Sequence, residues 1–155
     1  MDTLAYITWQ MARDSNALGF IPKTTLKSRY LARNLYLLQR NSLGEKIGYL
    51  LHGPPKAGQA LYVHQCVIRL DHRRRLHATR LVCSLIARAR LNGVDALHLR
   101  CALTLEASFF WPTLGFRLHH VENGGPGRNR KIGVYTLDLA TRPFPTAVLT
   151  SHALA

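Results

Sequence analysis

The segment from Ala60 to Leu91 changes its hydrophobic period once, and this change restricts the fold more than any other feature of the sequence. Residues 60–70, ALYVHQCVIRL, form the longest strand-like run, rich in apolar and β-branched side chains. From His77 onward the apolar residues recur at helical spacing, and one face collects Ala78, Leu81, Val82, Leu85 and Ala89. Asn92 and Gly93 then supply a helix stop. A strand, a short loop and an amphipathic helix therefore follow one another directly.

The rest of the chain alternates between the same two patterns. The periodicity predicts helices over 2–13, from about 24 to 33 and over 104–111, and strands over 34–40, 46–53, 95–103, 116–121 and 132–140. The turn residues NSLGE predict that the first two of these strands form a hairpin. This alternation predicts a mixed α/β (α+β) fold with one domain over residues 1–140. The tail, 141–155, contains two prolines, which leaves its partial disorder open.

Composition excludes several classes of protein. No apolar run approaches the roughly 18 residues that span a bilayer, and the first residues lack a signal-peptide pattern, so we expect no membrane partner. Cys66, Cys83 and Cys101 are odd in number and lack CxxC spacing, which argues against a disulfide framework and for a reducing cytoplasm. The histidines match no zinc spacing, and we expect no metal site.

Charge is the outlier of the composition. The chain carries 21 basic and 8 acidic residues, a formal net charge of +13, which favours polyanionic partners. Arg73, Arg74 and Arg75 stand where the predicted strand meets the predicted helix. The first N–H groups of a helix lack intrahelical partners and attract anions, and the guanidinium fork matches phosphate oxygens. The junction therefore predicts a phosphate-binding loop, with a solvated arginine turn as the alternative.

Two stretches of the sequence resemble hallmarks of the GNAT N-acetyltransferase superfamily. Residues 66–82, CVIRLDHRRRLHATRLV, resemble its acyl-CoA pyrophosphate loop, in which Arg or Gln is followed by two residues, Gly, one residue, and Gly or Ala. Residues 99–116, LRCALTLEASFFWPTLGF, resemble its aromatic pair followed by a turn and Gly-Phe. The resemblance covers roughly residues 1–140. It implies a mostly antiparallel central sheet, flanked by helices and splayed between the two strands that hold the cofactor.

The sequence also departs from the pattern of the superfamily. Leu76 stands where a glycine is usual, and it fits there if its backbone is helical and its side chain turns inward. Trp111 stands where many members carry the tyrosine that protonates the departing thiolate, and Ser108 lies near a common CoA-contacting asparagine. Pro112 predicts an early end of its helix. The first strand of the superfamily fold is predicted to be missing, because the chain begins with a helical pattern.

The resemblance implies an acyl-CoA-dependent N-acyltransferase (an enzyme) with acetyl-CoA or another acyl-CoA as its cofactor. Backbone N–H groups near Val67 and Ile68 would bond the thioester carbonyl. The full set of cofactor contacts implied by the two hallmarks is Val67, Ile68, Arg73, Arg74, Arg75, Leu76, His77, Ala78, Thr79, Ser108 and Trp111.

The candidate base comes from the strand before the arginines. A period of two residues places Tyr62, His64, Cys66 and Ile68 on one face, and the register from Arg73 matches Tyr62 and His64 to catalytic positions of the superfamily. His64 is the candidate base, since an ordinary histidine pKa of about 6.5 suits proton acceptance near neutral pH. Tyr62 is the second candidate, as an acid or a water-positioning hydroxyl. A hydrogen-bonded histidine without a catalytic role is the alternative.

The acceptor is predicted beside the basic loop ENGGPGRNRK, where Arg128, Arg130 and Lys131 are the candidate acceptor-binding residues. A nucleic-acid amine, on a modified DNA base or an aminoacyl-tRNA, fits this charge. In fold type and charge only, the chain is similar to Mom-like phage DNA-modification acyltransferases, which places it in the cytoplasm of a bacterial or phage-infected cell. The alternatives are a non-catalytic nucleic-acid-binding module on a degenerate GNAT scaffold, and an acetyltransferase for a small-molecule or protein amine. A homodimer remains open.

Overall fold

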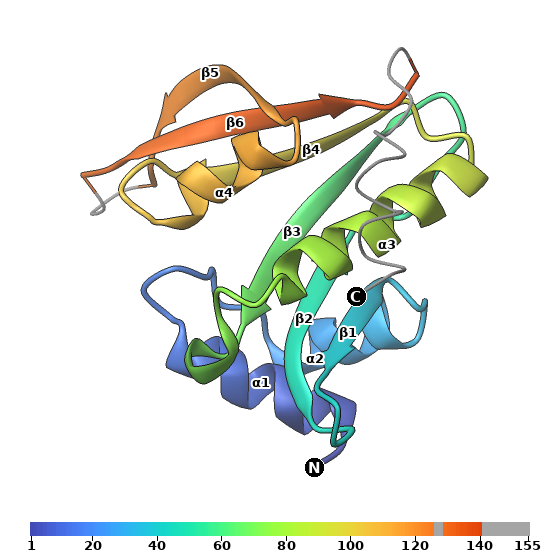
Figure 1. Cartoon of the computed structure of the whole chain (residues 1–155), viewed down its shortest axis with the longest axis vertical. Coiled ribbons are helices and arrows are strands. Elements are labelled where there is room, and N and C mark those ends of the chain that lie inside the picture. The colour runs from blue at the N-terminus through green and yellow to red at the C-terminus, as the bar shows by residue number, and fades with distance from the viewer. Residues whose placement is uncertain (126–128, 141–155) are drawn as a thin grey trace.

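The computed structural model describes residues 1–125 and 129–140, and its strands form one open sheet. The strands are β1 (Tyr36–Arg40), β2 (Lys46–His52), β3 (Ala60–Ile68), β4 (Ala96–Ala102), β5 (Arg117–Asn123) and β6 (Lys131–Asp138). They lie in the order β1-β2-β3-β4-β6-β5, and every neighbouring pair is antiparallel except β3 and β4 (Figure 1). The predicted mixed, mostly antiparallel sheet is therefore confirmed.

Helices cover both faces of the sheet. They are α1 (Thr3–Arg13), α2 (Lys23–Thr25) with its π-helical continuation η1 (Leu26–Leu31), the 3₁₀ turn η2 (Leu70–His72), α3 (His77–Leu91) and α4 (Ala107–Thr113). The α1–η1 pair packs on β1–β3 through Ile7, Leu26 and Tyr49. On the other face α3 packs through Val82 and Leu85. Helix α1 is the first element of the described residues, and the Asp2 side chain caps it, 2.7 Å from the Ala5 N–H.

One predicted helix boundary is wrong. Pro112 lies inside α4, which continues to Thr113 instead of ending before the proline. A proline removes the bond that its own N–H would make to the carbonyl four residues earlier. Here that carbonyl belongs to Ser108, and it accepts a hydrogen bond from the Tyr135 hydroxyl at 3.5 Å instead. Tertiary contact thus satisfies the acceptor that the proline leaves open.

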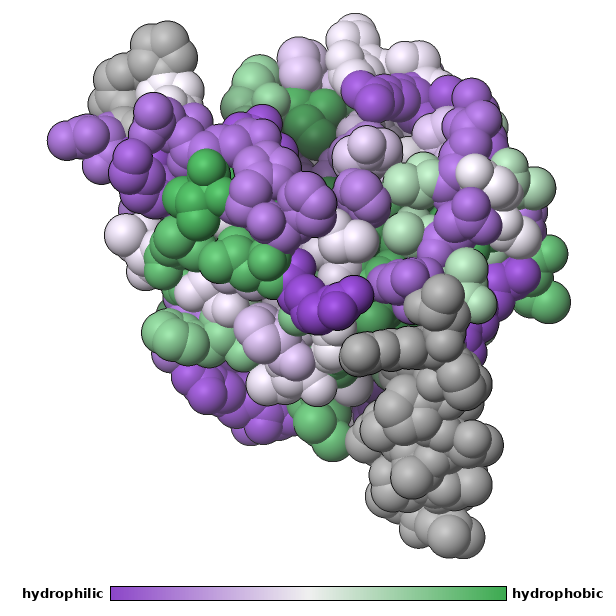
Figure 2. All heavy atoms as spheres, turned by 90° about the horizontal axis from the view of Figure 1, so that it is seen from above, coloured by the Kyte–Doolittle hydropathy of each residue, from purple (hydrophilic) through white to green (hydrophobic). Residues whose placement is uncertain are grey.

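The strands β3 and β4 pair only over their first residues and then separate, which divides the sheet into two halves. Residues 60–63 pair in parallel with 96–99, and the pairing stops there although β3 continues to Ile68 and β4 to Ala102. The two strands diverge in Figure 1, with α3 beside β3 and α4 beside β4. This is the splay that the resemblance predicted. Seen from above, hydrophilic residues are interspersed with several separate hydrophobic patches (Figure 2).

Candidate functional site

A cavity of about 870 Å³ opens where β3 and β4 separate. Its walls are the end of β3, the loop and first turn of α3, the helix α4, and the loop after α1. A volume of this size is within the usual range for small-molecule and cofactor sites. The predicted cofactor contacts that line it are Val67, Ile68, Arg73, Arg74, Leu76, His77, Ala78, Thr79 and Trp111.

Two residues of the loop before α3 have positive φ. Arg74 and Leu76 both have left-handed backbones, with φ of 63° and 64°. Positive φ at these two positions turns the chain sharply before it enters α3. Leu76 thus has a left-handed backbone, which glycine adopts at little cost, and its side chain is 52 % exposed. The condition stated for a leucine at this position, a helical backbone with an inward side chain, is therefore not met.

The first turn of α3 presents N–H groups to this cavity. Arg80 is the first residue of the helix whose N–H bonds to a backbone carbonyl, that of Leu76 at 3.0 Å. The N–H groups of His77, Ala78 and Thr79 therefore precede the helical ladder. No acidic side chain occupies this first turn. The positive end of the helix dipole and these donors fit the diphosphate of a CoA molecule.

The three arginines have different surroundings. Arg73 donates from Nε to the Ile68 carbonyl and from Nη2 to Asp14 Oδ1, both at 2.8 Å. It lines the cavity, but two protein acceptors already hold it, so it ties the end of β3 to the loop after α1. Arg74 forms an ion pair with Glu106 at 2.6 Å between the α3 loop and the start of α4, and both side chains are exposed. Arg75 is exposed and does not line the cavity.

The deeper part of the cavity wall is apolar. Burial raises the pKa of the Cys66 thiol to about 12, so this thiol stays neutral at physiological pH. Trp111 is buried against the rings of Phe110 and Phe116. The Ser108 hydroxyl bonds to the Leu105 carbonyl at 2.7 Å and does not reach the cavity. A pantetheine arm would therefore meet aliphatic and aromatic surface here.

Sequence reasoning missed several lining residues. The loop after α1 contributes Asp14, Ala17 and Leu18, Glu106 contributes from the residue before α4, and Phe109 contributes from α4. The turn-forming composition of residues 14–23 predicts a loop, but it does not predict where that loop lies in the fold. Its position over the cavity depends on long-range contacts, such as the bond from Gln65 Nε2 to the Gly19 carbonyl.

A bulge in β3 changes which residues share a face. Leu51 pairs with Gln65 and His52 pairs with Val63, so His64 has no partner on β2. The alternation reverses at this point. Val63 belongs to the core under α3 and Val67 to the core under α1. The prediction that Tyr62 and His64 share a face with Cys66 and Ile68 is therefore wrong: the first two lie on the face opposite α3.

His64 lies against η1 on that opposite face. Its Nδ1 is 2.7 Å from the Tyr30 hydroxyl. Burial lowers the pKa of His64, and the nearby charges of Arg29 and His52 lower it further, which favours a neutral imidazole at pH 7. Tyr62 is 54 % exposed, and its ring centroid lies 5.3 Å from that of His98 on β4. Neither His64 nor Tyr62 lines the cavity.

The predicted acceptor loop is held by the protein itself where it is described. Arg130 Nη1 donates to the Asn16 carbonyl at 3.1 Å, and Lys131 Nζ donates to Asn123 Oδ1 at 2.6 Å. Arg128 is outside the described residues. The Arg130 contact brings the loop before β6 to the loop after α1, on the rim of the opening between the strands.

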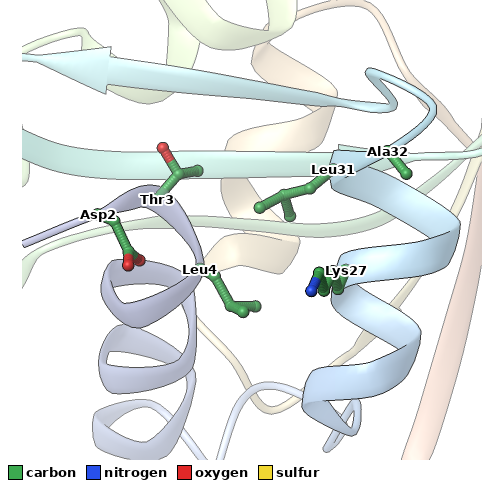
Figure 3. A pocket seen from close by; sticks show the side chains of 6 residues that line it. All are labelled: Asp2, Thr3, Leu4, Lys27, Leu31 and Ala32. Carbon is green, nitrogen blue, oxygen red and sulfur yellow. The ribbon is translucent and has the colours of Figure 1, made fainter.

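A second hollow, of about 420 Å³, lies between α1 and η1 (Figure 3). Side chains from the start of α1 and from η1 line it: Asp2, Thr3, Leu4, Lys27, Leu31 and Ala32. It is shallow and apolar, and it contains none of the predicted site residues. We therefore take the cavity between the splayed strands as the candidate site. No helix of the described residues is long and apolar enough to cross a membrane.

Solved structures share this arrangement. No protein-family model and no curated protein sequence matches the chain. Structural matches include a protein assigned to the GNAT family of acetyltransferases from Desulfovibrio desulfuricans, with 15 % identity, a TM-score of 0.65, and coverage of 86 % of this chain and 92 % of that one. The ribosomal-protein-S18-alanine N-acetyltransferase from Escherichia coli has 17 % identity, a TM-score of 0.68 and 94 % coverage of both chains.

A third match carries a cofactor. YncA from Salmonella typhimurium, assigned as an acetyltransferase, was solved with its cofactor acetyl-CoA; it has 19 % identity, a TM-score of 0.65, and coverage of 81 % of this chain and 78 % of that one. At these identities the matches show a shared fold. This chain has the fold of the GNAT acetyltransferases.

Proposed function

We propose that this chain is an acyl-CoA-dependent N-acyltransferase with acetyl-CoA as its donor. The observation that carries this proposal is the cavity between β3 and β4, which ends at the unpaired N–H groups of the first turn of α3. A phosphate group suits that end and a pantetheine arm suits the apolar wall. The structural match solved with acetyl-CoA supports the same cofactor.

The cofactor supplies an acyl thioester, whose carbonyl carbon an amine can attack with loss of the thiolate. This chain contributes the surroundings. Beyond Val63 the edge of β3 that faces the opening has no partner on β4. The Arg69 N–H bonds to the Ile47 carbonyl next to β2 at 2.8 Å, and N–H directions alternate along a strand, so the Val67 N–H points to β2 and the Ile68 N–H points to the opening. The Ile68 N–H would therefore be available to a carbonyl oxygen. An acceptor on the face opposite α3 would approach through the opening between the strands, and His64 lies on that face.

His64 has the protonation state that a base needs. Its lowered pKa favours the neutral imidazole at pH 7. In the tautomer whose Nδ1–H donates to the Tyr30 oxygen, Nε2 would accept the proton that the amine releases, directly or through water. Tyr62 on the same face is the second candidate. Trp111 has no acidic hydroxyl, so the thiolate would take its proton from another donor or from water.

The acceptor class that the charge favours is an amine on a nucleic acid, such as a modified base or an aminoacyl-tRNA. The net charge of +13 attracts polyanions, and 8 carboxylates are few for holding a cationic amine. An amine of a small molecule or protein is the alternative acceptor. Mass spectrometry of nucleic acid incubated with the protein and labelled acetyl-CoA would separate these classes.

Two variants of α3 test the cofactor site. Thr79→Glu places a carboxylate in the first turn, where the helix dipole favours it but a diphosphate would be repelled. Ser84→Glu makes the same charge change at an exposed position further along the helix. In calorimetry we expect Thr79→Glu to weaken CoA binding tenfold or more and Ser84→Glu by less than about twofold. Equal binding by both variants, or none by the wild type, would contradict the proposal.

A further inference from the structure

Part of the sheet has a face that no described helix covers. The helices α1 and η1 pack on β1–β3, while α3 and α4 pack on the opposite face. The side of β4, β6 and β5 that faces away from α3 and α4 therefore carries partly or fully exposed side chains. This surface extends from Tyr62 on β3 across the sheet to β5. We call this surface the open face; its members in the described residues are Tyr62, His98, Arg100, Arg117, His120, Glu122, Ile132, Val134, Thr136 and, at its end, Asp138.

The strand register places aromatic rings at the centre of this surface. Tyr62 is opposite His98 on β4, His98 is opposite Thr136 on β6, and Thr136 is opposite Arg117 on β5. The rings of Tyr62 and His98 meet edge to face, and more than half of Tyr62 is exposed. An exposed tyrosine on a sheet, with no apolar partner over it, offers a stacking surface for a planar ring. Among the described residues no group of three or more metal-binding side chains forms, so these histidines do not indicate a metal.

Arginines border the rings on two sides. On η1, Arg29 is exposed and lies with its guanidinium carbon 5.5 Å from the centre of the Tyr30 ring, beside His64. On the other side, Arg117 is exposed, and Arg100 is 61 % exposed although it pairs with Glu122 at 2.8 Å. The carboxylates of this face are Glu122 and, at its end, Asp138. Cations thus outnumber carboxylates around a stacking centre.

We infer that the open face binds single-stranded nucleic acid, with a base stacked on Tyr62 and phosphates beside Arg29 and Arg117. This inference rests on the proposed function, because it names the surface along which the acceptor would reach the opening between β3 and β4. A single strand is favoured over a duplex, since the rings of a duplex are stacked on one another and closed to a protein side chain. The inferred acceptor contacts thus lie on the sheet and not on the loop of Arg130 and Lys131, because those two side chains bond within the protein.

The binding test uses fluorescence anisotropy of labelled single-stranded DNA, single-stranded RNA and duplex DNA, without CoA. We expect both single strands to bind more tightly than the duplex. A preference for DNA or for RNA would show whether the protein favours deoxyribose or ribose in its ligand. Tyr62→Ala should weaken binding roughly tenfold, whereas Tyr62→Phe, which keeps the ring, should bind within about twofold of wild type. Arg117→Ala should flatten the slope of log K against log salt by about 0.7, whereas Arg40→Ala, on the far edge strand, should leave it unchanged.

Each result decides the inference separately from the cofactor proposal. Duplex binding as tight as single-strand binding, or equal loss in Tyr62→Ala and Tyr62→Phe, would overturn the stacking surface. So would a normal salt slope in Arg117→Ala. If CoA binds in the Thr79 test but no oligonucleotide binds, the open face fails while the acyltransferase proposal stands. If oligonucleotides bind but CoA does not, the acyltransferase proposal fails instead.

Discussion

Replacing Leu76 by glycine tests the backbone of the cofactor loop. Leu76 has φ 64° and ψ 10°, a left-handed conformation that costs a residue with a Cβ about 1–2 kcal/mol relative to glycine. Glycine removes this cost, but it adds about 0.4–1 kcal/mol of unfolded-state entropy relative to alanine. The Leu76 side chain is half exposed, so its loss removes only part of the 1.5–3 kcal/mol that a fully buried leucine contributes. We expect a net change in stability within about 1 kcal/mol.

Leu76→Ala is the matched control, because it removes the same side chain and keeps the Cβ. The difference in the free energy of unfolding between the two variants isolates the effect of the backbone conformation. The glycine variant should be more stable than the alanine variant by about 0.5–1 kcal/mol. For a protein of this size that is a rise in Tm of roughly 1–4 °C, measurable by calorimetry. CoA should bind Leu76→Gly at least as well as wild type, because the smaller residue lets a diphosphate approach the backbone. An alanine variant as stable as the glycine variant, or loss of CoA binding on substitution by glycine, would refute the reasoning.

Three further predictions concern catalysis, pH and packing. His64→Ala should lower kcat by about 10² to 10⁴ while CoA affinity stays the same in calorimetry; full activity near pH 7 would assign the base to Tyr62 or water. Burial lowers the pKa of His52 in the folded protein, so below about pH 6.5 the unfolded protein binds more protons than the folded one. The free energy of unfolding should therefore decrease as the pH is lowered, by up to about 1.4 kcal/mol per pH unit. Urea unfolding at pH 7.5 and 5.5 checks this, and His52→Gln should reduce the difference; an unchanged midpoint would contradict it. Gly48→Ala should cost about 1–3 kcal/mol, because a Cβ there would lie 2.8 Å from the Val67 carbonyl and against Ile68, whereas Gly19→Ala, with open space around it, should be neutral in the same assay.

Local sequence patterns determined the order of the elements and the place of the loop that is proposed to bind phosphate. The hydrophobic period depends on residues close together in the sequence, so the observed bounds of α1, β3 and α3 are close to the predicted ones. The junction of Arg73–Arg75 with α3 was equally local, since a helix start always presents free N–H groups. The GNAT hallmarks added the splay of β3 from β4, which no period of two or 3.6 residues encodes.

Tertiary structure alone decided which side chains meet at the site. The bulge at His64 arises from the pairing of β3 with β2, and it moves Tyr62 and His64 to the face opposite Cys66. A one-residue slip reverses every later side chain, and nothing within β3 signals it. Likewise Arg73 is held by Asp14, 59 residues earlier in the chain. Helices can be predicted from contacts within a few residues, whereas this site depends on contacts between distant segments, which exist only after the chain has folded.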